Sequence, residues 1–143
     1  MTQYDPDNIF AKIIAGQIPC HKVYEDRDTL AFVDIMPQGE GHTLVLPKTG
    51  SRNLLDASAS SLSATIATTQ KVARAVKKAF AADGVTIMQF NEAPAGQSVF
   101  HLHFHVIPRF EGVALRPHSG TMADPEKLKE HAKKIADALA SEA

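Results

Sequence analysis

The chain has 143 residues, a formal net charge of −1 and one cysteine, Cys20, which fits a single domain, residues 1–143, with its own hydrophobic core. The near-zero net charge gives no general attraction to nucleic acid, a lone cysteine forms no internal disulfide, and no apolar run nears the ~20 residues of a membrane span. Because the first residues are polar and acidic, unlike a signal peptide, we expect a cytoplasmic protein that binds neither nucleic acid nor membrane.

A short helix and three strands are predicted in the first third of the chain. Asp5 or Asp7 is expected to cap the helix, because short polar side chains accept hydrogen bonds from the first free N–H groups. The apolar stripe of this helix consists of Ile9, Phe10, Ile13 and Ile14. Runs of β-branched and apolar residues then predict strands, and Pro47 is expected to end the last of them. The predicted strands are residues 23–25, 29–33 and 42–46.

A long helix, two more strands and a final helix are predicted in the rest of the chain. Apolar residues recur every three or four positions between Ser58 and Ala82, which is typical of one long helix. Residues 85–90 and 100–107 are predicted strands, the second ended by Pro108, and Asp124–Pro125 marks the start of a final helix. The expected core residues of the long helix are Leu62, Ile66, Thr69, Val72, Val76 and Phe80, and those of the final helix are Leu128, Ala132, Ile135 and Leu139.

The order of these elements indicates the fold class. Helix, three strands, long helix, two strands and helix predict an α+β fold with a mostly antiparallel sheet, because short connections favour hairpins. Residues from about 110 to 143 form a C-terminal tail and helix in this interpretation.

Three histidines alternate with apolar residues in the last predicted strand. Because alternate side chains of a strand share a face, His101, His103 and His105 are expected on one face. The other face, against the core, would consist of Phe100, Leu102, Phe104 and Val106.

Three interpretations of this histidine row are open. The first is a solvated strand with chance histidines. The second is a metal site, although residues four apart lie roughly 13 Å apart at Cα, which is too far for His101 and His105 to share one tetrahedral zinc. A pair of histidines with a ligand from elsewhere stays possible. The third is nucleophilic catalysis, because neutral imidazole attacks phosphorus well and also leaves well.

Residues just before the row favour the third interpretation. Gly96 lets backbone N–H groups approach phosphate oxygens closely, and Gln97 and Ser98 add neutral donors. We predict that one ring nitrogen of His103 donates its proton to a backbone carbonyl, which fixes the tautomer with a lone pair for attack.

The segment His101-Leu102-His103-Phe104-His105-Val106-Ile107 resembles the signature of the histidine triad (HIT) nucleotide-binding family. The resemblance spans nearly the whole chain, from residues 8–19 through 32–35 and 41–48 to 91–98. It is similar to the bacterial Hint-like branch, whose members are homodimeric purine nucleoside phosphoramidases and related hydrolases. The resemblance implies a five-stranded antiparallel sheet with a short N-terminal, a long central and a C-terminal helix, and a homodimer.

The resemblance also implies roles for individual residues. His103 is the nucleophile that takes up the nucleotidyl group, and His101 and His105 flank it at the α-phosphate or leaving group. Ser98 and His42 complete the expected catalytic set, and Asp34 holds the ribose hydroxyls. The phosphate-side loop is expected to bind through Asn91, Gly96, Gln97 and Ser98, and the slot for the purine base through Ile9, Phe10, Ile13 and Ile18.

Each of these roles has a structural alternative. The residues of the slot could be ordinary core residues, and Asp34 could be a loop cap. His42 could be a strand histidine whose ring nitrogens are hydrogen-bonded within the protein. Many bacterial relatives bind a structural zinc through a Cys-x-x-Cys pair, a later histidine and the first triad histidine. Asn8, Ala11 and Gly50 stand at those ligand positions here, so we expect neither this zinc nor any other cofactor.

The expected reaction is displacement at the α-phosphorus of a nucleoside 5′-phosphate derivative, such as adenosine phosphoramidate, followed by hydrolysis of a nucleotidyl-histidine. Two alternatives stay open from the sequence: a dinucleoside polyphosphate hydrolase, and a nucleotide-binding regulatory module with little turnover.

Overall fold

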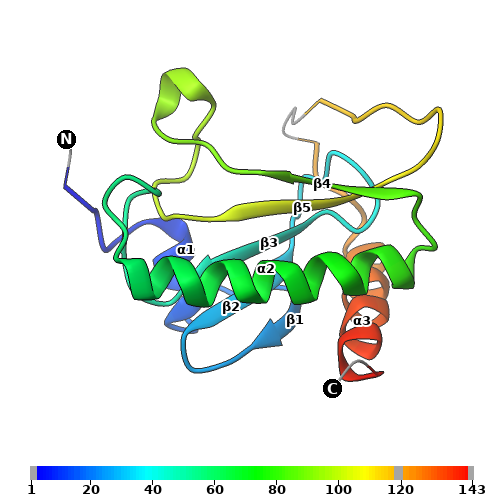
Figure 1. The fold of residues 1–143 in the computed structure, drawn as a ribbon, viewed down its shortest axis with the longest axis horizontal. Helices are drawn as coiled ribbons and strands as arrows, with labels where there is room; N and C mark the ends of the chain where they lie inside the picture. The colour runs from blue at the N-terminus through cyan, green and yellow to red at the C-terminus, as the bar shows by residue number, and fades with distance from the viewer. Residues whose placement is uncertain (1–2, 118–120, 142–143) are drawn as a thin grey trace.

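The computed structural model describes residues 3–117 and 121–141. Its five strands form one antiparallel sheet in the order β1-β2-β3-β5-β4 (Figure 1), which confirms the predicted α+β class. Residues 118–120 and 142–143 of the expected C-terminal tail lie outside the described residues. The elements are α1 (Ile9–Ile14), β1 (Lys22–Glu25), β2 (Thr29–Val33), β3 (Thr43–Pro47), α2 (Ala59–Ala79), β4 (Gly84–Met88), a 3₁₀ turn (Ala93–Ala95), β5 (Phe104–Arg109) and α3 (Pro125–Ser141).

The two faces of the sheet bury different clusters because successive strand residues point to opposite sides. Ala31, Val33 and Val45 pack with α2 and α3 in the larger cluster. Leu30, Phe32, Leu44 and Leu46 pack with Phe10 of α1 in the smaller one. Figure 1 shows α2 running across one side of the sheet. The short helix α1 therefore covers a separate, thinner part of the core.

The first helix is capped at a residue other than the two that were predicted. Asn8 is its N-cap, and the Asn8 side chain accepts a hydrogen bond from the N–H of Ala11 at 2.9 Å. Asp5 instead accepts from the N–H of Asp7 in a local turn. The prediction that Asp5 or Asp7 caps the helix was therefore wrong, and an Asx-type turn takes the side chain of Asp5 instead.

The predicted inward face of α2 is confirmed at Thr69, which is buried, and wrong at Ile66, which is 53% exposed. Thr65 and Thr68, which were not predicted there, are also buried. Burial is tolerated because Thr65 and Thr69 donate their hydroxyls to the carbonyl four residues earlier, and Thr68 bonds Thr29 at 2.8 Å. Buried hydroxyls with such partners avoid the cost of desolvation, so threonines face the sheet and Ile66 faces outward.

The last strand begins at Phe104 rather than at residue 100, and Pro108 lies inside it. The ladder of β5 with β3 reaches only from Phe104 to Val106, and its ladder with β4 begins at His105. β4 has ended opposite His105, and β3 continues to Pro47 but pairs there only with β2, so residues 100–103 join no strand ladder. Pro108 pairs with Val85 beyond the end of the β3 ladder, where a missing N–H is tolerated.

The remaining boundaries differ less. Pro47 is the last residue of β3 rather than the residue after it, and β4 ends at Met88 instead of residue 90. Asp124 accepts a hydrogen bond from the N–H of Glu126, so the predicted start of α3 is confirmed. Within the described residues, no helix is long and apolar enough to cross a bilayer.

Candidate active site

A cavity of about 180 Å³ lies between α1, the ends of β2 and β3, and the start of β5. A larger hollow, of about 370 Å³, is lined by residues 38–40, 108–110 and 113–116. We place the candidate site in the smaller cavity because it holds the histidines. Its lining includes eight of the residues that the sequence singled out, namely Ile9, Phe10, Ile13, Ile18, Asp34, Ser98, His103 and His105.

The tautomer of His103 is fixed by its own backbone neighbourhood. Its Nδ1 lies 2.7 Å from the carbonyl oxygen of His101. Since a carbonyl only accepts, Nδ1 must carry the proton, and Nε2 then carries the lone pair of the neutral ring. This confirms the predicted carbonyl acceptor. The ring is buried edge-on against Phe10, with centroids 4.9 Å apart, so the geometry suits a neutral imidazole nucleophile.

His101 is buried away from the cavity, with both ring nitrogens bonded inside the protein. Its Nε2 donates to the carbonyl of Pro47 at 2.7 Å, and the Tyr4 hydroxyl donates to its Nδ1 at 2.7 Å. Burial lowers the pKa of His101 below its ordinary value, partly opposed by the bond to Pro47. Burial also raises the pKa of Tyr4, so at neutral pH the phenol keeps the proton that it donates.

His42 and His105 form a buried pair beside Asp34. The backbone N–H of Gln38 donates to Nδ1 of His42, so the proton of this ring is on Nε2. His42 Nε2 donates to His105 Nδ1 at 2.9 Å and lies 3.6 Å from a carboxylate oxygen of Asp34. A neutral His105 therefore carries its proton on Nε2. Because its ring centroid is 5.0 Å from that of His103, it brings a donor to the side of that ring.

This cluster has the composition of a metal site but not the hydrogen bonding of one. Ligand atoms of Asp34, His42 and His105 all lie within 4.8 Å of one another. A metal on Nε2 of His42 would move the ring proton to Nδ1, where the N–H of Gln38 already donates. Two donors would then face each other, so the arrangement fits a chain of hydrogen bonds better than a metal ion.

Two of the positions at which the family resemblance leads us to expect zinc ligands make other contacts in this chain. Asn8 caps α1 and bonds the N–H of Ala11. At Gly50, a Cβ atom would lie 2.5 Å from the ring of Tyr4.

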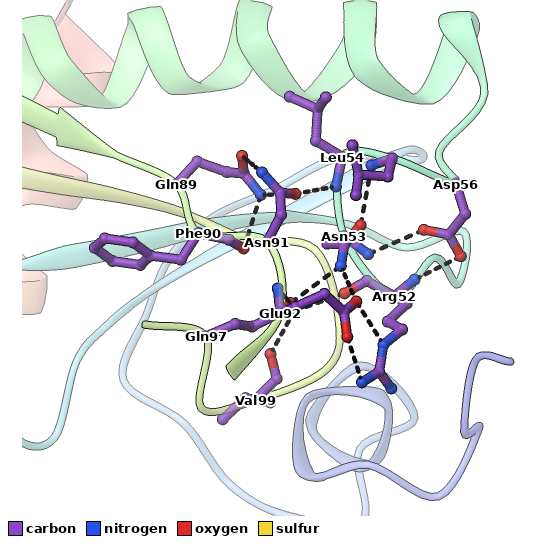
Figure 2. A network of polar contacts seen from close by, with 11 residues as sticks. Arg52, Asn53, Leu54, Asp56, Gln89, Phe90, Asn91, Glu92, Gln97 and Val99 are labelled. Carbon is purple, nitrogen blue, oxygen red and sulfur yellow. Dashed lines mark hydrogen bonds and ion pairs between the residues drawn. The ribbon is translucent and has the colours of Figure 1, made fainter. Parts of the chain in front are cut away.

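Three residues of the expected phosphate-side loop are built into the protein instead of lining the cavity. Gln97 is buried, its amide donates to the carbonyls of Arg52 and Val99, and its oxygen accepts from Glu92 and Asn53. Figure 2 shows this network, in which Asn91 also accepts from the N–H of Leu54. Gly96 has φ +107°, a conformation that favours glycine, and lies against the ring of Phe90. Ser98 alone of the four expected loop residues lines the cavity.

Sequence reasoning gave no role to the residues that hold this loop. Glu92 has φ 76° and ψ 157°, a region that is nearly exclusive to glycine. Its carboxylate accepts two bonds from Arg52, at 2.8 and 2.9 Å, and one from Asn53 at 2.6 Å (Figure 2). These bonds lower the pKa of Glu92 and raise that of Arg52. The Arg52 guanidinium also lies 4.1 Å above the ring of Phe100, so Phe100 is a surface partner and not the core residue that alternation predicted.

Known proteins resemble this chain in sequence and in fold over most of its length. The family model of the HIT domain matches residues 15–112. A Hit-like protein involved in cell-cycle regulation from Bartonella henselae is 58% identical, covers 94% of this chain and 98% of its own, and has a TM-score of 0.89. A hypothetical histidine triad nucleotide-binding protein from Sulfolobus tokodaii is 31% identical over 92% and 91% of the two chains, with a TM-score of 0.85. The adenylylsulfatase HINT3 of Arabidopsis thaliana is 38% identical over 105 residues, which are 73% of this chain and 53% of that protein.

Proposed function

The chain belongs to the HIT family of nucleotide-binding proteins, and from this premise we propose that it is a hydrolase or transferase acting at the α-phosphorus of nucleoside 5′-phosphate derivatives of the adenosine phosphoramidate type. The observation that carries the proposal is the tautomer of His103. Its Nδ1–H is held by the His101 carbonyl at 2.7 Å, which leaves the lone pair on Nε2 in a cavity that also contains Asp34 and Ser98.

Substrate binding follows from the lining of this cavity. The purine base lies in the apolar slot of Ile9, Phe10, Ile13 and Ile18, which offers stacking area but little discrimination between bases. Asp34 is the ribose residue, because a carboxylate accepts hydrogen bonds from both hydroxyls of a vicinal diol. Its Oδ1 accepts from the N–H of Met36 at 2.9 Å, which fixes the orientation of the carboxylate.

Two displacements make up the reaction. His103 Nε2 attacks the α-phosphorus, the bond from phosphorus to the leaving nitrogen breaks, and that nitrogen takes up a proton from water. The hydroxide equivalent of the same water then attacks phosphorus and releases the histidine. The positive charge on the nucleotidylated ring is stabilised by the His101 carbonyl at Nδ1, and the Nε2–H of His105 is a donor for a phosphate oxygen.

Acid-quenched mass spectrometry during turnover tests the covalent step. With adenosine 5′-phosphoramidate as the substrate, we expect an adenylyl group on the peptide that contains His103. A chiral phosphorothioate substrate run in parallel is expected to retain its configuration, since two in-line displacements invert it twice. Activity is expected to survive chelators. Inversion at phosphorus, or the absence of an adduct, would mean that water attacks directly. Turnover of diadenosine polyphosphates, measured in parallel, tests the alternative substrate class.

We also propose a homodimer formed through an exposed apolar surface. Leu54 and Leu55 precede α2, Ile66 projects from α2, and Ile87 lies on β4, the last strand of the sheet. All four side chains are at least 41% exposed. An uncovered strand edge beside apolar side chains is a liability that pairing with a second copy removes. In sedimentation experiments we expect a dimer for the native chain and a monomer for Ile66→Glu. Val113→Glu is the control at an exposed apolar residue outside this surface, and it should stay dimeric. A native chain that is monomeric at micromolar concentration contradicts the proposal.

A further inference from the structure

We propose that Tyr4 is a positioning residue for the nucleophile, acting through the ring of His101. The Tyr4 phenol bonds the His101 ring, and the backbone carbonyl of His101 accepts the hydrogen bond from Nδ1 of His103. The inference rests on the proposed role of His103 as the nucleophile. In this proposal His101 positions His103 instead of contacting the substrate.

The hydrogen bonds around His101 allow only one arrangement of protons. The carbonyl of Pro47 accepts from Nε2 at 2.7 Å, so Nε2 carries the proton and Nδ1 is an acceptor. The Tyr4 hydroxyl, 2.7 Å away, is the donor that satisfies it. The His101 ring has no exposed surface and meets the Tyr4 ring edge-on, with centroids 5.6 Å apart. Without the phenol, a buried acceptor would lose its donor.

Such a loss matters here because residues 101–103 lie before β5 and outside the sheet ladder. Among the residues that the structure describes, their main-chain anchor is the bond from the N–H of Leu102 to the carbonyl of Ser51 at 2.9 Å. The side chain of His101 provides a second anchor, to the last residue of β3 and to the segment before α1. If that ring shifts, the carbonyl that sets the tautomer and aim of His103 shifts with it. A nucleophile that is misaligned by a fraction of an ångström loses rate more than binding.

Gly50 leaves the space in which the Tyr4 ring lies. A Cβ atom there would lie 2.5 Å from Cε2 and 2.8 Å from Cζ of Tyr4, which is closer than real contacts allow. The backbone of Gly50 is not in the left-handed region, so alanine brings no backbone strain of its own. The glycine is therefore needed because the Tyr4 ring lies against it, and Gly50→Ala should displace the phenol from His101 without removing it.

The test compares Tyr4→Phe with Tyr24→Phe, the other tyrosine of the chain. Tyr24 lies on β1, bonds Asp26 and does not line the cavity, so its variant removes a phenolic hydroxyl outside the candidate site. For Tyr4→Phe we expect kcat to fall roughly tenfold with KM within about twofold, and Tyr24→Phe to match the native chain. Nitrogen NMR of the imidazoles is the second measurement. The native His101 should show the Nε2–H tautomer with a hydrogen-bonded Nδ1, and in Tyr4→Phe its Nδ1 signal should move.

A double mutant tests the coupling. Gly50→Ala alone should reproduce the fall in kcat, and adding it to Tyr4→Phe should cost little more, because the two act through the same bond. The NMR result does not depend on activity, so a native chain without turnover would refute the proposed function while the His101 signals still test this inference. Unchanged His101 signals in Tyr4→Phe, or a kcat equal to that of Tyr24→Phe, would overturn it.

Discussion

His105 lies within the backbone ladder of the sheet, and Asp34 and His42 lie one residue outside β2 and β3, whereas Ser98, His101 and His103 lie in the segment that precedes β5. His105 pairs with Leu44 of β3 and Met88 of β4. Asp34 extends the hairpin of β2 and β3 through its N–H bond to the carbonyl of His42 at 2.9 Å. We call these three residues the ladder half of the site, and the segment 89–103 the tethered half.

The tethered half is held by side chains. Gln97 ties the loop to Arg52, Glu92 is clamped by Arg52 and Asn53, and His101 is fixed by Tyr4. A ladder spreads the position of a residue over many backbone bonds, so a single side-chain change leaves it in place. In the tethered half, the alignment of His103 depends on a few bonds that one substitution can remove.

The largest effect is expected at the junction of the two halves. His103→Ala should lower kcat by about 10⁴-fold, because the nucleophile is lost while the rest of the site stays. Calorimetry with a nucleoside monophosphate should give an affinity close to that of the native chain, because the slot and Asp34 are unchanged. If this variant kept near-normal turnover, the central histidine would be a ligand for phosphate and not a nucleophile.

A change in the ladder half should affect binding without disturbing alignment. Asp34→Ala is expected to weaken binding of ribonucleoside monophosphates by roughly 10- to 150-fold, as a lost charge-assisted hydrogen bond costs about 1.5–3 kcal/mol. Binding of 2′-deoxyribonucleotides should weaken less. Asp34→Asn is the control, since it keeps an oxygen that can accept the bond from Met36. Equal losses for both sugars would make Asp34 a structural residue.

A change in the tethered half should do the opposite. Glu92→Gln removes one side of the two-bond contact with Arg52, and we expect kcat to fall by about tenfold with little change in nucleotide affinity. Glu25→Gln is the matched control. Glu25 also forms ion pairs, with Lys22 and Lys48, which lower its pKa to about 2, but it lies on β1 outside the site. Equal rates for both variants would show that the clamp does not position Ser98 or the histidines.

The smallest effect concerns pH. Since burial lowers the pKa of His101, the unfolded chain binds a proton at about pH 6.5 that the native chain takes up only at lower pH. The free energy of unfolding should therefore fall as pH falls below about 6.5, with a slope of at most about 1.4 kcal/mol per pH unit from this residue. Burial also lowers the pKa of His131, so urea unfolding is measured in His131→Gln as well. A His101 ring that titrates at or above 6.5 by NMR contradicts the prediction.

The order of the elements, the antiparallel sheet and the alternation from His103 to Val106 could be predicted from the amino-acid pattern alone. These features depend on local periodicity and turn chemistry, which can be read from neighbouring residues. The eight predicted residues that line the cavity belong to segments whose placement follows from the fold. The carbonyl acceptor of His103 was predictable because it comes from two residues away.

The start of β5, the outward position of Ile66 and the internal bonds of Gln97 became clear only in the folded chain. Each depends on a partner distant in sequence: the pairing of Phe104 with Val45, the threonine contact to Thr29, and the carbonyl of Arg52. Glu92 at a positive φ and Tyr4 on His101 belong to the same class. No local pattern marks them, because their conformations are set by bonds that exist only after the chain has brought distant segments together.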